Sequence, residues 1–210
     1  MSPISRSALS RPRKRKTIVD SDLARNGLPI SAEMEYNRKP NREPSVHAAD
    51  PALLTIYFDG LCEPKNPGGV PVYAFIVSDT TTGRILTQEA GLAGAPWVES
   101  ATHDLAEYTA AIMGVKWVRE HAPIVELSIY GDSKPVIQLL NKVYKARSRE
   151  MLPLFNELTG QLEGLSWKAV WVPRENNSQA DKLTNDFYRD YCIEHHGRVL
   201  PTMRDTGAIS

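Results

Sequence analysis

The chain of 210 residues is long enough for one sizeable hydrophobic core and a tail, and its 25 basic and 25 acidic residues cancel. No stretch approaches the ~18 consecutive apolar residues of a membrane span, and the N-terminus lacks the apolar segment of a secretory signal. The only cysteines are Cys62 and Cys192, which excludes a disulfide framework and favours a reducing compartment, so we expect a cytoplasmic protein, or a nuclear one in an organism with a nucleus.

Residues 1–50 are rich in Ser, Pro, Arg and Asn and show no hydrophobic period, as is typical of a disordered tail. Six basic residues and no acid fall within positions 1–19. The basic run at 11–16 could raise affinity for a nucleic acid backbone, serve as a nuclear address, or form a plain solvated tail. The rest of the chain is correspondingly acidic, which fits a domain that holds a cluster of carboxylates.

The folded domain is expected over residues 51–194, followed by a flexible C-terminal tail over 195–210. Apolar runs, turn residues and caps predict nine elements in the order β-β-β-α-β-α-α-β-α, at residues 53–58, 70–78, 84–90, 102–121, 126–130, 133–144, 151–162, 167–172 and 178–192. The short links between the first three strands favour an antiparallel meander. This order predicts an α/β domain with a five-stranded mixed sheet, a meander plus parallel strands, flanked by helices.

Four acidic residues lie in apolar settings, where a solvated surface carboxylate would be out of place: Asp59, Glu107, Asp132 and Asp181. Asp59 and Asp132 are each expected at the end of a strand, and Glu107 and Asp181 near the start of a helix. Each also has a simpler interpretation, as a turn residue, a helix cap or a favourable partner of the helix dipole. Four neighbouring buried carboxylates would repel one another unless divalent cations lay among them, and such clusters form two-metal phosphodiesterase sites.

Five short motifs occur in a fixed order between residues 53 and 192. They are Tyr57-Phe58-Asp59-Gly60, Asn66-Pro67-Gly68-Gly69, Thr102 through Ala106-Glu107-Tyr108 to Ala111, Tyr130-Gly131-Asp132-Ser133, and Val172-Pro173-Arg174-Glu175-Asn176-Asn177 ending in Ala180-Asp181. This ordered set resembles ribonuclease H type 1. The four carboxylates follow the family's Asp-Glu-Asp-Asp order at separations of 48, 25 and 49 residues, and the resemblance leaves both tails unmatched.

The resemblance implies a ribonuclease H-like fold and hydrolysis of the RNA strand of RNA/DNA hybrids to 5′-phosphate and 3′-hydroxyl products. It also implies two Mg²⁺ ions, with Mn²⁺ as a substitute, and a monomer. Asp59 would contact both ions, Asp132 and Asp181 would hold the ion that activates water, and Glu107 would hold the ion at the leaving oxygen. These roles follow from the family, and oxygen ligands suit hard cations.

Five further residues are candidate substrate contacts by the same resemblance. Backbone amides near Asn66, Gly68 and Gly69 are expected to read the RNA strand, where glycines allow a close approach to a sugar-phosphate backbone. Thr102 matches the family's phosphate-binding position on the DNA strand, and His103 stands where relatives often carry Asn. His103 could equally be an ordinary exposed residue at a helix start.

The sequence also departs from the family. The segment 172–181 is short and lacks the His that assists turnover in bacterial members, so Arg174 or Glu175 could influence product release instead. Residues 142–149 form only a modest basic stretch near the position of the family's basic insertion. The alternatives to a hybrid ribonuclease are a 3′–5′ exonuclease of the same superfamily, a non-catalytic nucleic-acid-binding module of this fold, and a structural protein whose acids merely cap helices.

Overall fold

The computed structural model describes residues 51–122, 125–142 and 150–207. The predicted tail over 1–50 and most of the basic stretch at 142–149 lie outside these ranges. The elements are β1 (Ala52–Glu63), β2 (Val70–Asp79), β3 (Ile85–Leu92), α1 (His103–His121), β4 (Val125–Gly131), α2 (Lys134–Leu140), α3 (Leu152–Leu162), β5 (Ser166–Trp171), the 3-10 helix η1 (Arg174–Asn177) and α4 (Ser178–His196). Within the described ranges, no helix has the length and apolar character needed to cross a membrane.

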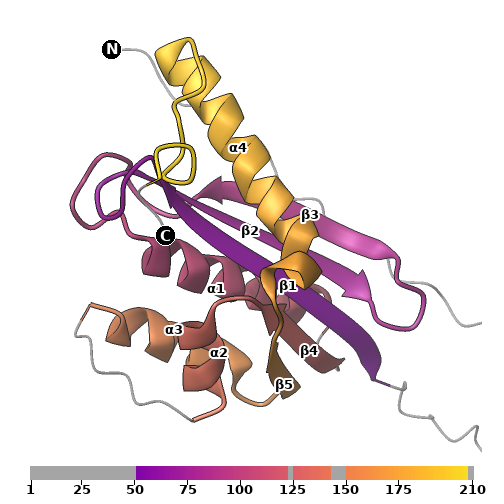
Figure 1. Cartoon of the computed structure of the whole chain (residues 1–210). Coiled ribbons are helices and arrows are strands. Elements are labelled where there is room, and N and C mark those ends of the chain that lie inside the picture. Colours follow the sequence, from indigo (N-terminus) through magenta and orange to yellow (C-terminus); the bar gives the residue numbers. More distant parts are fainter. Residues whose placement is uncertain (1–50, 123–124, 143–149, 208–210) are drawn as a thin grey trace, which may run out of the picture. The chain divides into compact units, whose positions relative to one another are not determined.

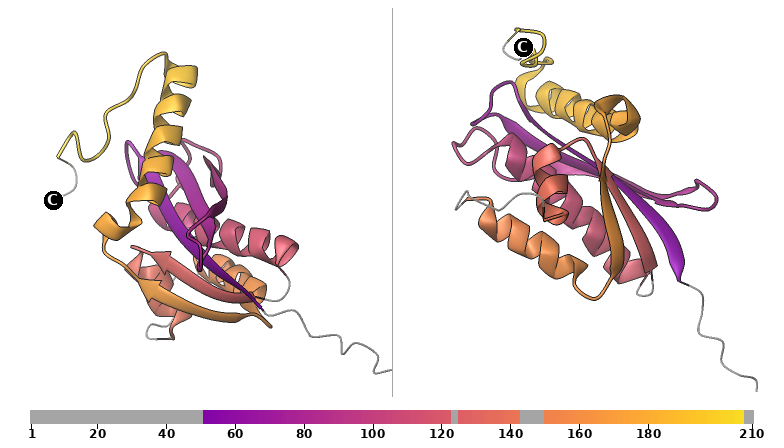
Figure 2. Two further views of the ribbon diagram at one scale, coloured as in Figure 1. Left: turned by 90° about the vertical axis from the view of Figure 1, so that its right-hand side faces the viewer. Right: turned by 60° about the horizontal axis from the view of Figure 1, so that its bottom comes forward.

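The five strands form one mixed sheet in the order β3-β2-β1-β4-β5 (Figure 1). β1, β2 and β3 pair in antiparallel fashion, while β4 joins β1, and β5 joins β4, in parallel. The predicted meander with added parallel strands is confirmed. Helices α1, α2 and α3 cover one face of the sheet and α4 lies across the other (Figure 2).

The core has two parts because the central strands are covered on both faces. On one face Ile56 and Phe58 of β1 pack in a large apolar cluster with residues of α1 and α3, such as Val115. On the other face Leu61 of β1 and Tyr188 of α4 belong to a second, smaller cluster. A strand buried on two sides has no need of alternating polar residues, which explains the continuous apolar run at the start of the domain.

Strand β1 is longer than its sequence suggests. It was expected to end at Phe58, but its antiparallel ladder with β2 continues to the pair of Glu63 and Val70. The parallel ladder with β4 does stop at the pair of Phe58 and Gly131. Asp59 therefore lies inside β1, at the first position beyond the reach of β4. The interpretation of Asp59 and the next residue as a turn is wrong, since pairing with β2 keeps the chain extended.

Gly60 has a different purpose from turn formation. A Cβ atom at this position would lie 2.3 Å from the backbone nitrogen of Glu107 in α1. No side chain fits in that space, so a glycine is required for α1 to pack directly on β1. The same close contact brings Glu107 beside the strand that carries Asp59.

The C-terminal part of the chain is more ordered than expected. α4 continues to His196 and ends at Gly197, whose φ of 68° is the left-handed cap that glycine adopts readily. The expected domain boundary at 194 falls inside this helix. Beyond it, the backbone nitrogen of Met203 donates to Oε2 of buried Glu63 at 2.6 Å. The described residues after 195 are thus not all loose, because a buried carboxylate at the end of β1 needs a donor.

Candidate active site

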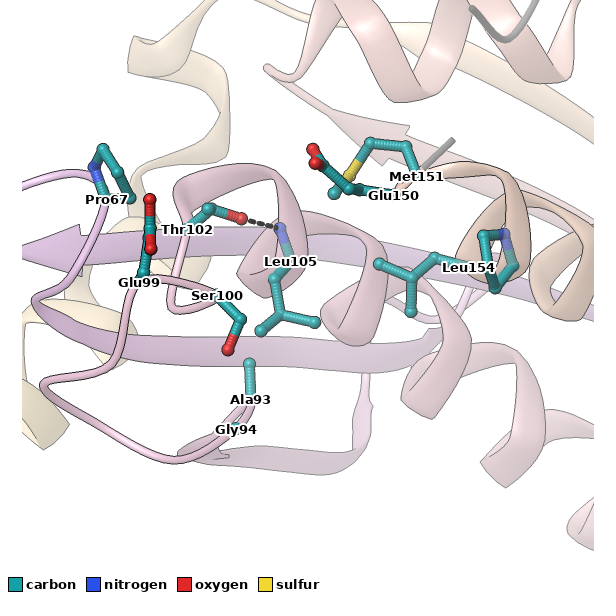
Figure 3. A pocket seen from close by; sticks show the side chains of 11 residues that line it. Pro67, Ala93, Gly94, Glu99, Ser100, Thr102, Leu105, Glu150, Met151 and Leu154 are labelled. Carbon is teal, nitrogen blue, oxygen red and sulfur yellow. Dashed lines mark hydrogen bonds between the residues drawn. The ribbon is translucent and has the colours of Figure 1, made fainter. Parts of the chain in front are cut away.

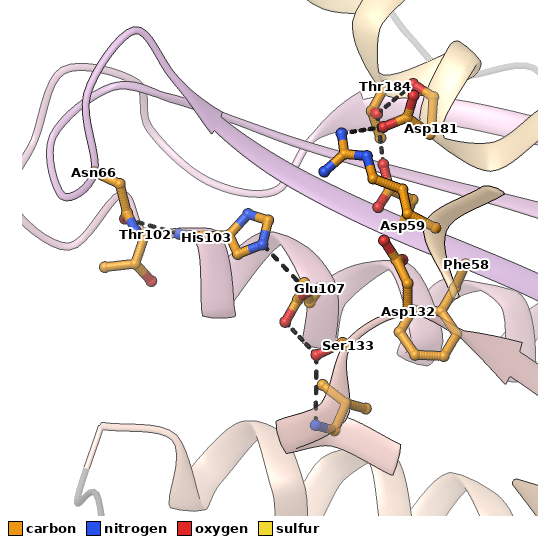
Figure 4. A network of polar contacts seen from close by, with 12 residues as sticks. Phe58, Asp59, Asn66, Thr102, His103, Glu107, Asp132, Ser133, Asp181 and Thr184 are labelled. Carbon is orange, nitrogen blue, oxygen red and sulfur yellow. Dashed lines mark hydrogen bonds and ion pairs between the residues drawn. The ribbon is translucent and has the colours of Figure 1, made fainter. Parts of the chain in front are cut away.

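The four predicted acids come from β1, α1, the residue after β4, and α4, at one end of the β1–β4 pair (Figure 4). Asp59 in β1 and Glu107 in α1 are buried, with 5% and 7% of their surfaces exposed. Asp132 directly follows β4, and Asp181 lies in the first turn of α4; both are half-buried. Since β4 ends beside Phe58, Asp132 leaves the sheet next to the position where Asp59 points from β1.

Two uncharged side chains connect three of these acids. The hydroxyl of Thr184 in α4 is 2.7 Å from Oδ2 of Asp59 and 2.9 Å from the backbone oxygen of Asp181. Asn177 in η1 donates from Nδ2 to Oδ1 of Asp132 at 2.7 Å and to the backbone oxygen of Phe58 at 2.9 Å. The segment from η1 into α4 therefore holds the carboxylates of β1 and β4 in position.

Glu107 is fixed separately, by residues on both sides. The hydroxyl of Ser133, the residue that caps α2, donates to Oε2 of Glu107. Nε2 of His103, one turn earlier in α1, lies 3.2 Å from its Oε1. The backbone nitrogen of His103 in turn donates to Oδ1 of Asn66 at 3.0 Å. Glu107 is thus connected to the Asp132–Ser133 corner and to the turn at residues 64–69.

Burial and neighbouring charges perturb the acids and their partners. Burial, together with the charges of Asp132 and Asp181, raises the pKa of Asp59 to about 7, against a lowering by the Thr184 hydrogen bond and the charge of Arg174. For His103, burial alone would lower the pKa, but the hydrogen bond and charge of Glu107 outweigh it and the pKa is raised. Strongly perturbed pKa values of this kind are typical of functional sites.

The Arg174 guanidinium of η1 forms an ion pair with Oδ1 of Asp181. Glu175, the other residue predicted for product release, is exposed. As the side chains stand, no group of three or more His, Cys, Asp or Glu side chains in the described ranges could hold a metal ion. Each of the four carboxylates instead accepts a hydrogen bond from another side chain. Thr184 donates to Asp59 and Arg174 to Asp181. Asn177 donates to Asp132 and Ser133 to Glu107.

The candidate substrate residues are close to the acids but are partly engaged within the protein. The amide of Gly68 donates to the backbone oxygen of Ala101 at 2.8 Å, and the oxygen of Gly69 accepts from Trp97 at 2.8 Å. The Gly68 amide, one of the groups predicted to read RNA, is therefore used to fix the turn. Thr102 is the predicted cap of α1: its hydroxyl accepts from the amide of Leu105 at 3.1 Å.

A cavity of about 920 Å³ lies beside the start of α1 (Figure 3). Thr102 and Leu105 line it together with Pro67, Glu99 and Met151. None of the four predicted acids belongs to its lining. The wall near Thr102 contains an acidic side chain, which is unfavourable for a phosphate group.

Thr184, Ser133 and Asn177 were not among the predicted site residues. A weak signal exists for Thr184, which lies three residues after Asp181 and so shares its helix face. Ser133 was expected only as a helix cap, and it does accept from the amide of Val136 at 3.5 Å. Its contact with Glu107 and the contacts of Asn177 depend on tertiary packing and have no local signature.

The sequence of this chain is similar to those of known proteins. The model of a family described as "Reverse transcriptase-like" matches residues 77–187, more than half of the chain. Ribonuclease HI of Halobacterium salinarum is 28% identical over 162 residues, covering 72% of this chain and 68% of that protein. A bifunctional protein of Mycobacterium tuberculosis is 30% identical over 89 residues, covering 41% of this chain and only 24% of its own length. The chain thus spans about a quarter of that mycobacterial relative.

Solved structures share the fold. The N-terminal RNase H domain of the mycobacterial protein Rv2228c superposes with a TM-score of 0.56 at 25% identity, over 64% of this chain and 92% of that one. RNase H1 of Halobacterium salinarum superposes with a TM-score of 0.57 at 22% identity, over 66% of this chain and 98% of that one. LC11-RNase H1, solved in complex with RNA/DNA hybrid, superposes with a TM-score of 0.55 at 22% identity, over 63% of this chain and 94% of that one. This protein belongs to the reverse transcriptase-like family; it is similar in sequence to a ribonuclease HI and shares its fold with the RNase H structures.

Proposed function

We propose that this protein is a metal-dependent endoribonuclease that hydrolyses the RNA strand of RNA/DNA hybrids and leaves 5′-phosphate and 3′-hydroxyl ends. The observation that carries the proposal is the convergence of Asp59, Glu107, Asp132 and Asp181 from four elements upon one end of the sheet. The similarity to a ribonuclease HI and the fold shared with an RNase H1 bound to RNA/DNA hybrid support it.

The donor chemistry of the residues present fits a pair of Mg²⁺ ions, or Mn²⁺ in their place, although the described side chains as they stand are not gathered around a metal. All four acids offer oxygen ligands, which hard divalent cations prefer. Burial keeps the pKa of Asp59 near 7 in the absence of a cation, and a bound cation would favour its ionised form. Among the described residues, buried Asn177 also has an Oδ1 atom with no hydrogen-bond partner. This atom lies beside Asp132, because the Nδ2 atom of the same amide donates to the Asp132 carboxylate. The four acids would hold the ions, which would activate water and stabilise the leaving oxygen.

The chain's own residues position this chemistry. Thr184 and Asn177 orient the carboxylates of Asp59 and Asp132, so that these groups are arranged before substrate arrives. Glu107 is held through His103 near the turn at 64–69, where the 2′-hydroxyls of an RNA strand would distinguish it from DNA. Contacts of this kind are made to the backbone, so cleavage would be independent of base sequence.

The partners and location follow as parts of the same proposal. The basic run at residues 11–16 would contact the nucleic acid backbone, and this contribution would weaken with added salt. The protein would act as a monomer in the cytoplasm. The pair Arg174 and Glu175 would influence how the product leaves, since the first of them contacts Asp181 directly.

The test is cleavage of an end-labelled RNA/DNA hybrid in Mg²⁺ by the full chain and by its Asp132→Asn variant. RNA/RNA and DNA/DNA duplexes and an EDTA sample are the controls, and circular dichroism verifies that both proteins are folded. We expect cleavage of the RNA strand in the hybrid alone, dependent on metal and lost in the variant. Hybrid binding without cleavage in Mg²⁺ or Mn²⁺ would instead identify a non-catalytic binding module.

A further inference from the structure

Arg174 differs from the other donors around the four acids. Thr184 and Asn177 are uncharged and buried, so they can remain in place whatever occupies the site. Arg174 carries a permanent charge, and its side chain is 44% exposed, against 23% for the side chain of Asp181 with which it pairs. An arginine with this much exposure has solvent available as an alternative to its carboxylate partner.

The charge of Arg174 acts directly on one of the four acids. Its guanidinium forms an ion pair with Oδ1 of Asp181. A guanidinium therefore neutralises part of the negative charge that four carboxylates create. A divalent cation at the same carboxylates would repel the guanidinium, because two positive charges a few ångströms apart in a partly buried site interact strongly. The two cations would therefore compete for Asp181.

We propose that Arg174 is an internal counter-ion that takes the place of the metal at Asp181 in the metal-free protein and leaves this carboxylate when the metal binds. The inference rests on the proposed function only in assuming that the four acids bind a divalent cation. It assigns to Arg174 a defined role: the residue offsets the negative charge of the site without metal and sets the metal concentration at which the site fills.

The experiment measures Mn²⁺ binding to the full chain by electron paramagnetic resonance, with no substrate present. Arg174→Gln removes the competing charge, so its dissociation constant should fall roughly twofold to fivefold, as expected for the loss of an exposed ion pair. Lys182→Gln is the matched control, because it removes one positive charge from the start of α4 while its partner is Asp186, not one of the four acids. Its dissociation constant should equal that of the wild type.

A double-mutant cycle separates competition from general electrostatics. In an Asp181→Asn background, Arg174→Gln should no longer tighten Mn²⁺ binding, because the carboxylate for which both cations compete is gone. Unchanged or weaker binding in the single variant Arg174→Gln would overturn the inference and leave the proposed function intact, since hybrid cleavage tests that function separately. Absence of Mn²⁺ binding by the wild type at millimolar metal would overturn both.

Discussion

Replacing Asp59 by Asn should stabilise the metal-free protein at high pH. Asp59 keeps its proton up to about pH 7 in the folded protein, against a value of 3.8 for an unperturbed aspartate. The contribution of Asp59 to stability is therefore greatest below pH 4 and falls as the pH rises to 7, by up to about 4 kcal/mol at ~1.4 kcal/mol per pH unit. Asparagine has no charge to lose and keeps an oxygen that can accept from Thr184.

The assay is urea unfolding of the wild type and Asp59→Asn in EDTA at several values between pH 4 and 8. Other groups titrate in both proteins, so the difference between the two unfolding free energies isolates Asp59. We expect this difference to grow with pH in favour of the variant and then to level off above pH 7. Saturating Mg²⁺ should reduce it by stabilising the wild type. Parallel pH profiles in EDTA would refute the assignment of a raised pKa to this carboxylate.

Three further outcomes follow from the contacts. Gly60→Ala should destabilise the protein by about 3 kcal/mol, because its Cβ would lie 2.3 Å from α1 backbone, whereas Gly160→Ala, with open space around it in α3, should stabilise by ~0.5–1 kcal/mol in thermal unfolding. Thr184→Val should lower the unfolding free energy by about 1–3 kcal/mol above pH 7, because the Asp59 carboxylate loses its hydrogen-bond donor. In the same urea unfolding assay, Thr184→Ser should retain most of the wild-type stability, because serine keeps the hydroxyl. Glu107→Gln should lower the raised pKa of His103 in an NMR titration; this ion pair stabilises the wild type at low pH and is lost as pH rises through that pKa.

The parts of the fold that depend on local chemistry were predictable. Thr102 and Ser133 were expected as helix caps, and each accepts a hydrogen bond from an amide three residues ahead. The order of the elements along the chain follows from apolar runs, and the antiparallel meander from the short links. The end of β1 was predicted wrongly, because its last five residues are held by pairing with β2 rather than by their own propensity. The need for Gly60 was hidden for a similar reason, since the helix it contacts is distant in sequence.

The candidate site divides in the same way. Its four acids were predicted because carboxylates are conspicuous in apolar surroundings. Their donors were not, since Thr184 and Asp59 are 125 residues apart and Asn177 and Asp132 are 45 apart. Threonine and asparagine are also common in exposed positions, so their types give no warning of burial. Sequence reasoning therefore finds the charged groups of such a site more readily than the neutral groups that position them.

The room for the site comes from a change of strand pairing at Phe58. β1 continues beside β2, but β4 ends at this level and the chain turns into α2, so that Asp59 has no strand neighbour on that side. Asn177 enters from η1 at this point and donates to both the Phe58 backbone oxygen and Asp132. If Asn177 only filled space, an apolar residue would stabilise the fold better. Among the described side chains, the Oδ1 of Asn177 is buried without a hydrogen-bond partner, and burying such an atom costs free energy. An unsatisfied oxygen beside the carboxylates is better explained as a group kept for the hydrated or metal-bound site.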